Sequence, residues 1–410
     1  MTLKVVTFGC RLNSYESELI KKSATDAGLT DTVIFNSCAV TSEAERQLRQ
    51  AIRKEKRNNP NAKLIITGCA AQVNAQKYAS MPEVDKVIGN TEKTKKDSYL
   101  SLAETEKVLV NDIMSVTETA PQFIDSFDGR ARAFMQVQTG CNHRCTFCII
   151  PYGRGNSRSV PIGEIVLQAQ LLVDAGFKEI VITGVDITGY GLDLPGTPSL
   201  AQMILRLLNN VPKLHRLRFS SIDVAEIDDE LLELIVKEPR IMPHLHLSLQ
   251  SGDNMILKRM KRRHNRQQII DFCDEVRKLR PDVVFGADII AGFPTEDAAM
   301  FQNTLNIVDE ANLTYLHVFP YSERDGTPAS RMPQVEKHIR KERAKILRKK
   351  GEEKIAQHYQ SQIGKRLNVL VEAGNIGRSA DFSAVKLENV SEGDLLEVTI
   401  TSASSNMLYV

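Results

Sequence analysis

Short apolar runs alternate with polar segments along the first 120 residues of the chain. Three of these runs, VVTFGC, VIFNSC and LIITGC, end at Cys10, Cys38 and Cys69. Buried strands separated by helical segments are typical of β-α-β units in a parallel sheet. The pattern therefore predicts a Rossmann-like parallel-sheet domain over residues 1–120.

Two helix-start signals follow these runs. Asn13 with Glu16, and Ser42 with Glu45, have the spacing of a capping box, so we expect helices to begin there. Right-handed crossovers place the carboxyl ends of successive strands on one edge of a parallel sheet, so the three cysteines can converge beside helix amino termini, where thiolates are favoured. The alternative is that they are three small core residues, because cysteine is often buried.

The segment from Ala133 to about residue 330 again alternates short strands with helices. Repeated units of this kind predict a partial α/β barrel, similar to a TIM barrel, within a second domain at residues 128–358. In PHLHLSLQSG, three leucines alternate with polar residues, which predicts a strand that packs on helices outside and faces a polar interior. The polar positions of this strand are His244, His246, Ser248 and Gln250.

The remaining segments are a linker, a helix and a small β module. Polar residues around Thr117–Gln122 predict the linker, and Lys337–Lys350 is a helical stretch rich in Lys and Arg. Alternating apolar residues over 360–410 predict an all-β module. This module holds four basic and six acidic residues, a balance of 4 − 6 = −2, which makes it a poor electrostatic trap for RNA.

Composition narrows the function classes. The 410 residues are 42% hydrophobic and 25% charged, as in a soluble globular protein rather than a disordered chain or a rod. No apolar stretch is long enough to span a bilayer, and MTLKVVTFGC lacks the features of a secretory signal, so we expect a cytoplasmic protein with no membrane partner. The net charge of +2 neither requires nor excludes a nucleic acid.

The chain has seven cysteines, and an odd number in a long cytosolic chain favours metal or redox chemistry over disulfides. Cys141, Cys145 and Cys148 form a C-x3-C-x2-C group directly after a strand. Zinc sites present paired CxxC units, and ferredoxins add a fourth nearby cysteine, so neither pattern fits. A [4Fe–4S] cluster held by three thiolates leaves one iron open for a small ligand. Cys273, within IIDFCDEVRKL, has the spacing of a helix-core residue.

The C-x3-C-x2-C group, with the aromatic Phe147 before its last cysteine, resembles the signature of the radical S-adenosylmethionine enzymes. The segments FGCRLNSYESE, FNSCAVTSEAE, ITGCAAQ, TGVDITGYG, HLHLSLQSG and DIIAGFPTE, and the order of the three domains, resemble the methylthiotransferase family. The resemblance implies two [4Fe–4S] clusters. One lies at Cys141, Cys145 and Cys148 and binds S-adenosylmethionine; the other lies at Cys10, Cys38 and Cys69 and carries the sulfur. It also implies that the β module is a TRAM-like RNA-binding domain.

The resemblance also implies contacts to S-adenosylmethionine. Thr183, Gly184 and Asp186 match the strand motif near the methionine amino group, and Ser221 and Asp223 fall where ribose contacts occur. Gln250 lies on the polar face of its strand. The loop of Gly292, Phe293 and Pro294 matches a segment near the adenine. The alternative is that these glycines and Pro294 only form turns and that Gln250 is a satisfied polar group of the barrel.

Within the family, the known branches add a methylthio group to a modified adenosine beside the tRNA anticodon or to an aspartate of a ribosomal protein. FGCRLNSYESE and CTFCIIPYGRGNSRSV most resemble the branch that acts on N6-threonylcarbamoyladenosine, and the isopentenyladenosine branch is the nearest alternative. A non-catalytic iron–sulfur protein is a rival of another class. We expect one S-adenosylmethionine to methylate the sulfur and a second to yield the radical that activates carbon 2 of the base. The expected partners are the tRNA anticodon stem-loop, an electron donor and a sulfur donor.

Local clusters of Lys and Arg support an RNA substrate. One is the stretch after Lys337, and such clusters are typical of phosphate-binding surfaces. The alternative is that each is a solvated helix face. The other two clusters are Arg46, Arg49, Arg53, Lys54, Lys56 and Arg57, and Lys258, Arg259, Lys261, Arg262, Arg263 and Arg266.

Overall fold

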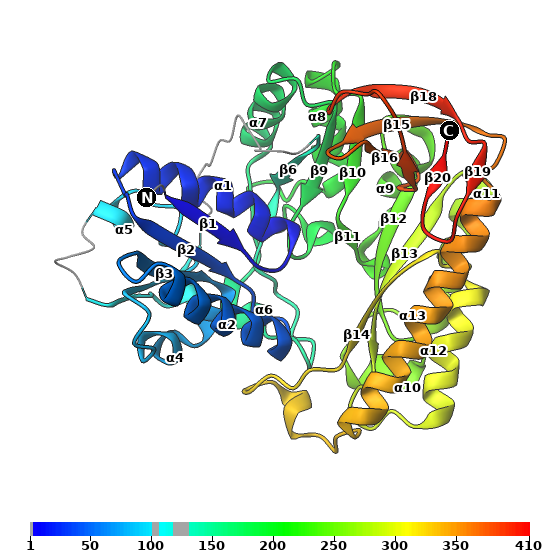
Figure 1. Ribbon diagram of the computed structural model, residues 1–410. Helices are drawn as coiled ribbons and strands as arrows, with labels where there is room; N and C mark the ends of the chain where they lie inside the picture. Colours follow the sequence, from blue (N-terminus) through cyan, green and yellow to red (C-terminus); the bar gives the residue numbers. More distant parts are fainter. Residues whose placement is uncertain (1–2, 101–105, 118–130) are drawn as a thin grey trace.

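The structure is a computed structural model that describes residues 3–100, 106–117 and 131–410. Figure 1 shows an N-terminal part in blue, a central part in green to yellow and a C-terminal sheet in orange to red. Beyond Thr117, the predicted linker lies outside the described residues. The domain boundaries given above stay predictions.

The N-terminal part is a parallel sheet with the strand order β1-β2-β3-β4-β5. This confirms the Rossmann-like prediction. The strands are β1 (Lys4–Thr7), β2 (Thr32–Ser37), β3 (Lys63–Gly68), β4 (Lys86–Ile88) and β5 (Val108–Leu109). The segments between and after them are α1 (Arg11–Asp26), α2 (Ser42–Asn58), α3 (Cys69–Val73), α4 (Ala75–Ala79), α5 (Asp97–Leu100) and the 3-10 turn η1 (Ile113–Ser115).

The first predicted helix start is wrong in position, whereas the second is confirmed, because α2 begins at Ser42. Helix α1 begins directly after Cys10, so Asn13 and Glu16 lie inside it, and no side chain caps its first turn. Helix α2 is capped by Thr41, whose hydroxyl accepts from the backbone N–H of Ala44. The capping-box spacing of Asn13 and Glu16 therefore has another cause, described below.

The central part is a partial barrel of parallel strands, as predicted. Its two sheets have the orders β10-β9-β6 and β11-β12-β13-β14, and β10 and β11 follow each other along the chain, so the sheets join there. Helices cover the outer side of these strands (Figure 1). The strands are β6 (Ala133–Gln136), β9 (Glu179–Thr183), β10 (Arg216–Phe219), β11 (Ser221–Ile222), β12 (His244–Gln250), β13 (Val284–Ala291) and β14 (Tyr315–Pro320).

One apolar core joins these strands to their helices, and Cys273 is buried in it as predicted. The long helices are α7 (Ile162–Asp174), α8 (Leu200–Asn210), α9 (Asp229–Lys237), α11 (Arg266–Leu279), α12 (Ala298–Glu310) and α13 (Lys337–Gln360). Shorter elements are β7 (Gln138–Thr139), β8 (Arg158–Ser159), α6 (Ile150–Arg154), α10 (Asn254–Arg259) and the 3-10 turns η2 (Ile187–Gly189), η3 (Val224–Glu226) and η4 (Pro328–Arg331). No described helix is both apolar enough and long enough to cross a membrane.

The C-terminal module is a curled sheet with the order β18-β15-β16-β17-β20-β19 and its own small core. The all-β prediction is confirmed, and its likeness to a TRAM domain stays a prediction. Its strands are β15 (Arg366–Glu372), β16 (Ile376–Ser379), β17 (Ala384–Lys386), β18 (Leu395–Thr399), β19 (Ser402–Ala403) and β20 (Leu408–Tyr409).

The module docks on the central part through arginines at the amino-terminal ends of the barrel strands. The guanidinium of Arg216 donates to the backbone carbonyl of Asn368 at 2.5 Å, and Arg218 donates to that of Ala380 at 3.1 Å. Phe382 stacks on His244 with ring centroids 5.1 Å apart. Glu372 contacts Arg132. Part of the negative charge of the module is therefore used in docking.

Candidate metal centres

The first cysteine group lies on the loop between β7 and α6, at the carboxyl end of the barrel strands. Gly140 makes the turn into this loop with a φ of 73°, which suits glycine. All three thiols are partly buried. The backbone N–H of His143 lies 3.3 Å from Cys141 Sγ, and Arg262 Nη1 lies 3.7 Å from Cys145 Sγ. N–H groups directed at sulfur stabilise thiolates, which are the form that binds iron.

Burial opposes the thiolate form at this loop. It raises the pKa of Cys148, and the charge of the neighbouring Cys145 adds to this, so that this pKa is about 12. Cys145 and Cys148 also contribute to the raised pKa of Cys141, after burial and Asp186. Cys141 and Cys148 therefore need a bound cation to ionise at neutral pH. The donor set therefore fits an iron–sulfur cluster.

The predicted Thr183–Asp186 motif lies beside this loop because of Gln138, a residue that sequence reasoning missed. Its side-chain oxygen accepts from the backbone N–H groups of Val185 and Asp186 at 3.0 and 2.9 Å. Its amide nitrogen donates to the carbonyl of Gly140 at 2.8 Å. A Cβ on Gly184 would meet the Gln138 carbonyl oxygen at 2.9 Å, so only glycine fits there. Gln138 thus ties the cysteine loop to the strand motif.

Asp186 belongs to an ionic network around the loop. His143 Nε2 lies 2.9 Å from Asp186 Oδ2 and 3.1 Å from Glu226 Oε1. Hydrogen bonds to these two carboxylates raise the pKa of His143 to about 10. Burial raises the pKa of Asp186. The hydrogen bond from His143 lowers this pKa, but by less than burial raises it. His143 and Glu226 carry no periodic signal in the sequence, and their role was not predicted.

Asp223 is held by the second predicted basic cluster. Arg262 and Arg263 donate to its Oδ2 at 3.0 and 3.1 Å, and Arg263 also donates to Glu226 at 2.7 Å. The interpretation of this cluster as a phosphate-binding surface is therefore wrong for these two arginines, because they neutralise carboxylates beside the cysteine loop. Arg266 likewise bonds to backbone carbonyls and to Glu310.

The other predicted contact residues surround the same loop. Phe147 packs edge-on to Phe293, with ring centroids 6.4 Å apart, in a small core of its own. Ser221 and Gln250 are partly buried, and among the described residues their side chains have no hydrogen-bond partner. Gln250 has a φ of 71° after an irregularity in the pairing of β12 with β13. A strained residue with a free amide is typical of a binding position.

The second cysteine group lies at the strand ends of the N-terminal sheet. Cys10 precedes α1, Cys38 follows β2 and Cys69 begins α3. Burial raises the pKa of Cys38, and the charges of Cys69 and Cys10 add to this, so that this pKa is about 12 and the three thiols lie near one another. A Cβ on Gly9 would lie 2.7 Å from that of Cys38, which shows how tightly the chain closes there. The convergence favours a ligand set over three unrelated core residues.

A buried cation from the central part faces this second group. Arg154, the last residue of α6, donates to Asn13 Oδ1 at 2.6 Å and to both carboxylate oxygens of Glu16 at 2.8 Å. Lys93 donates to the same carboxylate at 2.6 Å. The charges of Cys69 and Cys10 both act on the Arg154 guanidinium. The spacing of Asn13 and Glu16 therefore serves this network and not a helix cap.

The comparisons with known proteins bear on both groups. Residues 135–308 match the model of the Radical SAM superfamily, and residues 2–89 match the Uncharacterized protein family UPF0004. The Threonylcarbamoyladenosine tRNA methylthiotransferase MtaB of Rickettsia prowazekii is 61% identical over 94% of this chain and 91% of its own length. The chain belongs to the radical S-adenosylmethionine methylthiotransferases.

More distant relatives agree with this family. The protein of the same name from Aquifex aeolicus is 39% identical over 98% of this chain and all of its own length. The tRNA-2-methylthio-N(6)-dimethylallyladenosine synthase of Roseobacter denitrificans is 32% identical over 99% and 97%. A solved structure of the radical S-adenosylmethionine methyltransferase TsrM from Kitasatospora setae has a TM-score of 0.58 at 13% identity, covering 80% of this chain and 74% of that one, which supports the fold.

Membership in this methylthiotransferase family supports the predicted cofactors, and the assignment of the six cysteines as their ligands stays a prediction. Radical S-adenosylmethionine enzymes use a [4Fe–4S] cluster and S-adenosylmethionine. Methylthiotransferases carry a second [4Fe–4S] cluster, which matches the second cluster predicted above. The residues that sequence reasoning missed, Gln138, His143, Arg154 and Glu226, all act through other residues. Arg154 and Gln138 lie within or next to quoted motifs, and a buried polar position inside a motif is the signal that could have found them.

Proposed function

We propose that this chain adds a methylthio group to carbon 2 of N6-threonylcarbamoyladenosine beside the tRNA anticodon. The identity of 61% to a relative named for this substrate, over nearly the whole chain, carries the proposal. Relatives named for the dimethylallyl substrate are 32% identical. The same motifs and both cysteine groups fit either substrate, so the choice between them rests on the relatives and on the experiment below.

In this proposal, Cys141, Cys145 and Cys148 hold the cluster that binds S-adenosylmethionine, and Cys10, Cys38 and Cys69 hold the cluster that carries sulfur. When bound, these groups supply a carbon-centred radical and the sulfur to be transferred. The protein supplies position and exclusion of water. Ser221, Gln250 and the Thr183–Asp186 strand end bind S-adenosylmethionine in the partial barrel.

Each cysteine group has its own neighbouring charged residues. Arg154 places a buried positive charge near Cys10 and Cys69. Arg262 directs an N–H at Cys145 and neutralises Asp223. Asp186 and Glu226 hold a proton on His143 beside Cys141. The chain therefore offers a cation next to each cysteine group before any substrate binds.

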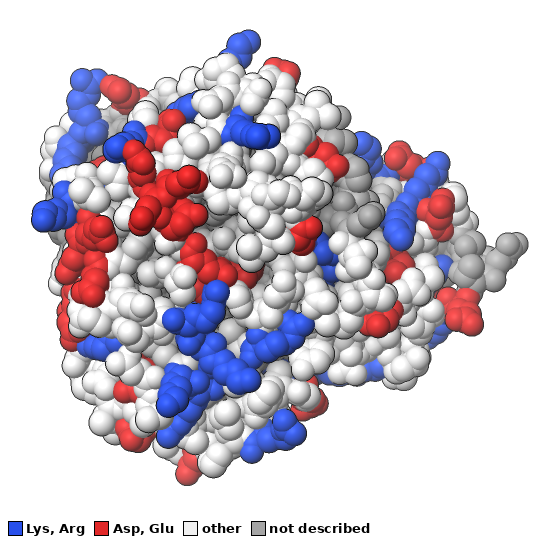
Figure 2. All heavy atoms as spheres, turned by 180° about the vertical axis from the view of Figure 1, so that it is seen from behind, with Lys and Arg blue, Asp and Glu red and all other residues white. Residues whose placement is uncertain are grey.

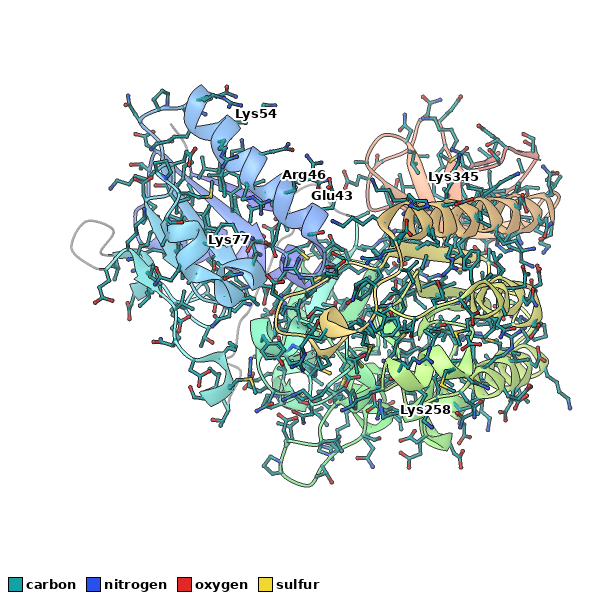
Figure 3. All side chains as sticks on the ribbon, turned by 90° about the horizontal axis from the view of Figure 1, so that it is seen from below. Glu43, Arg46, Lys54, Lys77, Lys258 and Lys345 are labelled. Atoms are coloured by element: carbon teal, nitrogen blue, oxygen red, sulfur yellow. The ribbon has the colours of Figure 1, made fainter. Side chains whose placement is uncertain are left out.

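Two basic helices are the proposed tRNA surface. Figure 3 shows Arg46 and Lys54 on α2 and Lys345 on α13 on the same side of the molecule, with Glu43 at the end of α2 that is nearer to α13. Some predicted cations are used elsewhere: Arg340 is buried, and Arg343 binds Glu296 at 2.8 Å. The cations of α13 that stay exposed without a recorded ion pair or hydrogen bond are Lys337, Lys341, Lys345 and Lys349.

The view from behind adds a third basic surface. Figure 2 shows Lys and Arg side chains gathered below the middle of the rear face, with Asp and Glu side chains gathered above them. Such local separation of charge in a chain of net charge +2 is what a protein needs to orient an anionic partner. The proposal also includes an external electron donor and a sulfur donor, which the reaction requires. The proposed site of action is the cytoplasm, because tRNA is the substrate.

The test is mass spectrometry of nucleosides from the bulk tRNA of a strain that lacks this gene. The strain is complemented with the wild-type gene, with Cys145→Ala or with Cys10→Ala. Loss of 2-methylthio-N6-threonylcarbamoyladenosine, restored by the wild-type gene and by neither variant, is the expected result. Loss of the methylthio form of isopentenyladenosine instead would assign the sister substrate. No change in either nucleoside would refute a role in tRNA methylthiolation.

A further inference from the structure

Two histidines and one carboxylate meet on the polar side of the barrel. His246, Asp288 and His317 come from the strands β12, β13 and β14, which are neighbours in one sheet and lie side by side in Figure 1. Each residue offers one atom that can bind a metal, and the three atoms all lie within 4.8 Å of one another. The proposed function gives none of these residues a role.

The pairing of the strands explains why the three side chains meet. Asp288 stands directly opposite His317 in the parallel register of β13 and β14. His246 stands opposite Gly286, which lies two residues before Asp288 and so on the same face of β13. A Cβ on Gly286 would lie 2.7 Å from His246 Nδ1. The bare backbone of Gly286 therefore makes room for the imidazole ring beside the carboxylate.

The distances between the three side chains fit one shared ion. His246 Nε2 lies 3.1 Å from Asp288 Oδ1, and His317 Nδ1 lies 3.4 Å from the same oxygen. The centroids of the two imidazole rings are 4.5 Å apart. Ligand atoms that lie about 2.0 to 2.1 Å from one zinc ion are about 3.4 Å from each other in a tetrahedron. Both nitrogen–oxygen separations are therefore close to those found around a bound ion.

The buried nitrogen of His246 also lacks a hydrogen bond. The side chain of His246 is 7% exposed, and its Nε2 has no hydrogen-bond partner within the described chain. Because Asp288 Oδ1 is only 3.1 Å away, this oxygen must lie to one side of the direction in which the nitrogen points. A buried polar atom without a partner costs free energy. An ion bound by both side chains removes that cost.

His317 lies on the solvent side of the group. Its side chain is 57% exposed, whereas that of Asp288 is 23% exposed. An ion can therefore enter beside His317, and water or a substrate group can take the position that three protein ligands leave open. Strand β14 is at the edge of its sheet. An ion at this place also ties the edge strand to β12 and β13.

We propose that His246, Asp288 and His317 bind one divalent transition-metal ion, for which zinc is the best match. Two imidazoles and one carboxylate are a ligand set of zinc sites that keep an open position. Zinc also binds such ligands more tightly than ferrous iron does. The site is separate from the cysteine loop, because His246 is the third residue of β12 and the loop lies at the carboxyl end of the strands. The inference does not depend on which RNA the chain modifies.

The test uses the full-length chain with both clusters loaded and oxygen excluded. Each protein is dialysed against buffered free Zn²⁺, and zinc and iron are then measured together by elemental analysis. X-ray absorption at the zinc edge reports which atoms surround the ion. The variants are His317→Gln, Asp288→Asn and His246→Gln. The matched control is His215→Gln, which changes an exposed histidine just before β10.

Wild type and His215→Gln should each bind about one zinc ion per chain, with the same iron content. His317→Gln should weaken zinc binding by about 100-fold or more, because losing even a residue that only supports a metal ligand costs about 10- to 100-fold. The absorption spectrum should show nitrogen and oxygen at about 2.0 to 2.1 Å and no sulfur at about 2.3 Å. Zinc should raise the unfolding temperature of wild type but not that of His317→Gln.

Wild type that takes up no more zinc than His317→Gln does would overturn the proposal. So would sulfur around the zinc, because the ion would then occupy cysteines that have lost their clusters. The variant of the exposed His317 keeps the test valid even if those of the buried His246 and Asp288 do not fold. The readout is metal content and not product, so this inference and the proposed function can fail independently of each other.

Discussion

Cys141, Cys145 and Cys148 share one loop, whereas Cys10, Cys38 and Cys69 come from three separate strand ends. The loop cysteines need only local chain geometry, but their surroundings, from Gln138 to Arg263, come from several barrel elements. The strand-end cysteines need the whole N-terminal sheet and, through Arg154, the central part as well. A site assembled from distant segments depends on docking between domains, so the two sites should respond differently to the same kind of damage.

The largest difference concerns the reaction itself. Cys145→Ala should abolish reductive cleavage of S-adenosylmethionine and all product. Cys10→Ala should keep cleavage to 5′-deoxyadenosine but form no methylthio nucleoside, because only the sulfur-carrying site is lost. Both products are quantified by chromatography with mass detection. Product from Cys10→Ala would contradict the role given to the strand-end cysteines.

The second difference concerns Arg154. Arg154→Ala leaves Glu16 buried with one cation fewer, and breaking a buried ion pair costs about 3 to 5 kcal/mol. Iron should fall from about eight to about four atoms per chain, because only the strand-end cluster depends on this residue. Iron analysis and urea unfolding check both expectations, and Arg144→Ala, an exposed residue of the cysteine loop, is the control. An equal loss of iron from both sites would contradict the division between them.

Acid should loosen the strand-end site through Glu16. Burial raises the pKa of Glu16, but Arg154 and Lys93 outweigh it and lower that pKa to about 2. A lowered pKa stabilises the fold above the unfolded value of 4.5, and this contribution is lost as the pH falls toward 2. The contribution is about 3 kcal/mol at neutral pH.

The measurement is the free energy of unfolding of wild type and Glu16→Gln at a series of pH values. The gap between the two proteins should be widest near neutral pH and should close as acid protonates Glu16. A gap that stays constant down to the lowest pH would show that the charge of Glu16 is not what stabilises the network.

The smallest expected effect is at the loop site. Gln138→Ala removes the acceptor of the Val185 and Asp186 N–H groups, and unsatisfied donors cost about 1 to 3 kcal/mol. Because the same bond positions the Thr183–Asp186 strand end, affinity for S-adenosylmethionine should fall by about tenfold. Equilibrium dialysis measures this affinity, with Gln170→Ala on the outer helix α7 as the control. Unchanged affinity would mean that the strand end does not need Gln138.

The sequence by itself determined the sheets and the cysteine groups. Apolar runs and strict alternation report burial residue by residue, so the parallel N-terminal sheet and the polar face of β12 followed from local patterns. The spacing of Cys141, Cys145 and Cys148 indicated one cluster site. The edge rule for parallel strands brought Cys10, Cys38 and Cys69 together.

Only the tertiary structure decided the charge pairs. Glu16 and Arg154 are 138 positions apart, and Asp223 and Arg263 are 40 apart, so no periodic pattern links them. The sequence around Glu16 therefore suggested a helix cap, and the sequence around Arg263 suggested a phosphate-binding surface. Both interpretations were wrong. A charged residue can be read from the sequence, but the residue that it pairs with is decided by the folded structure.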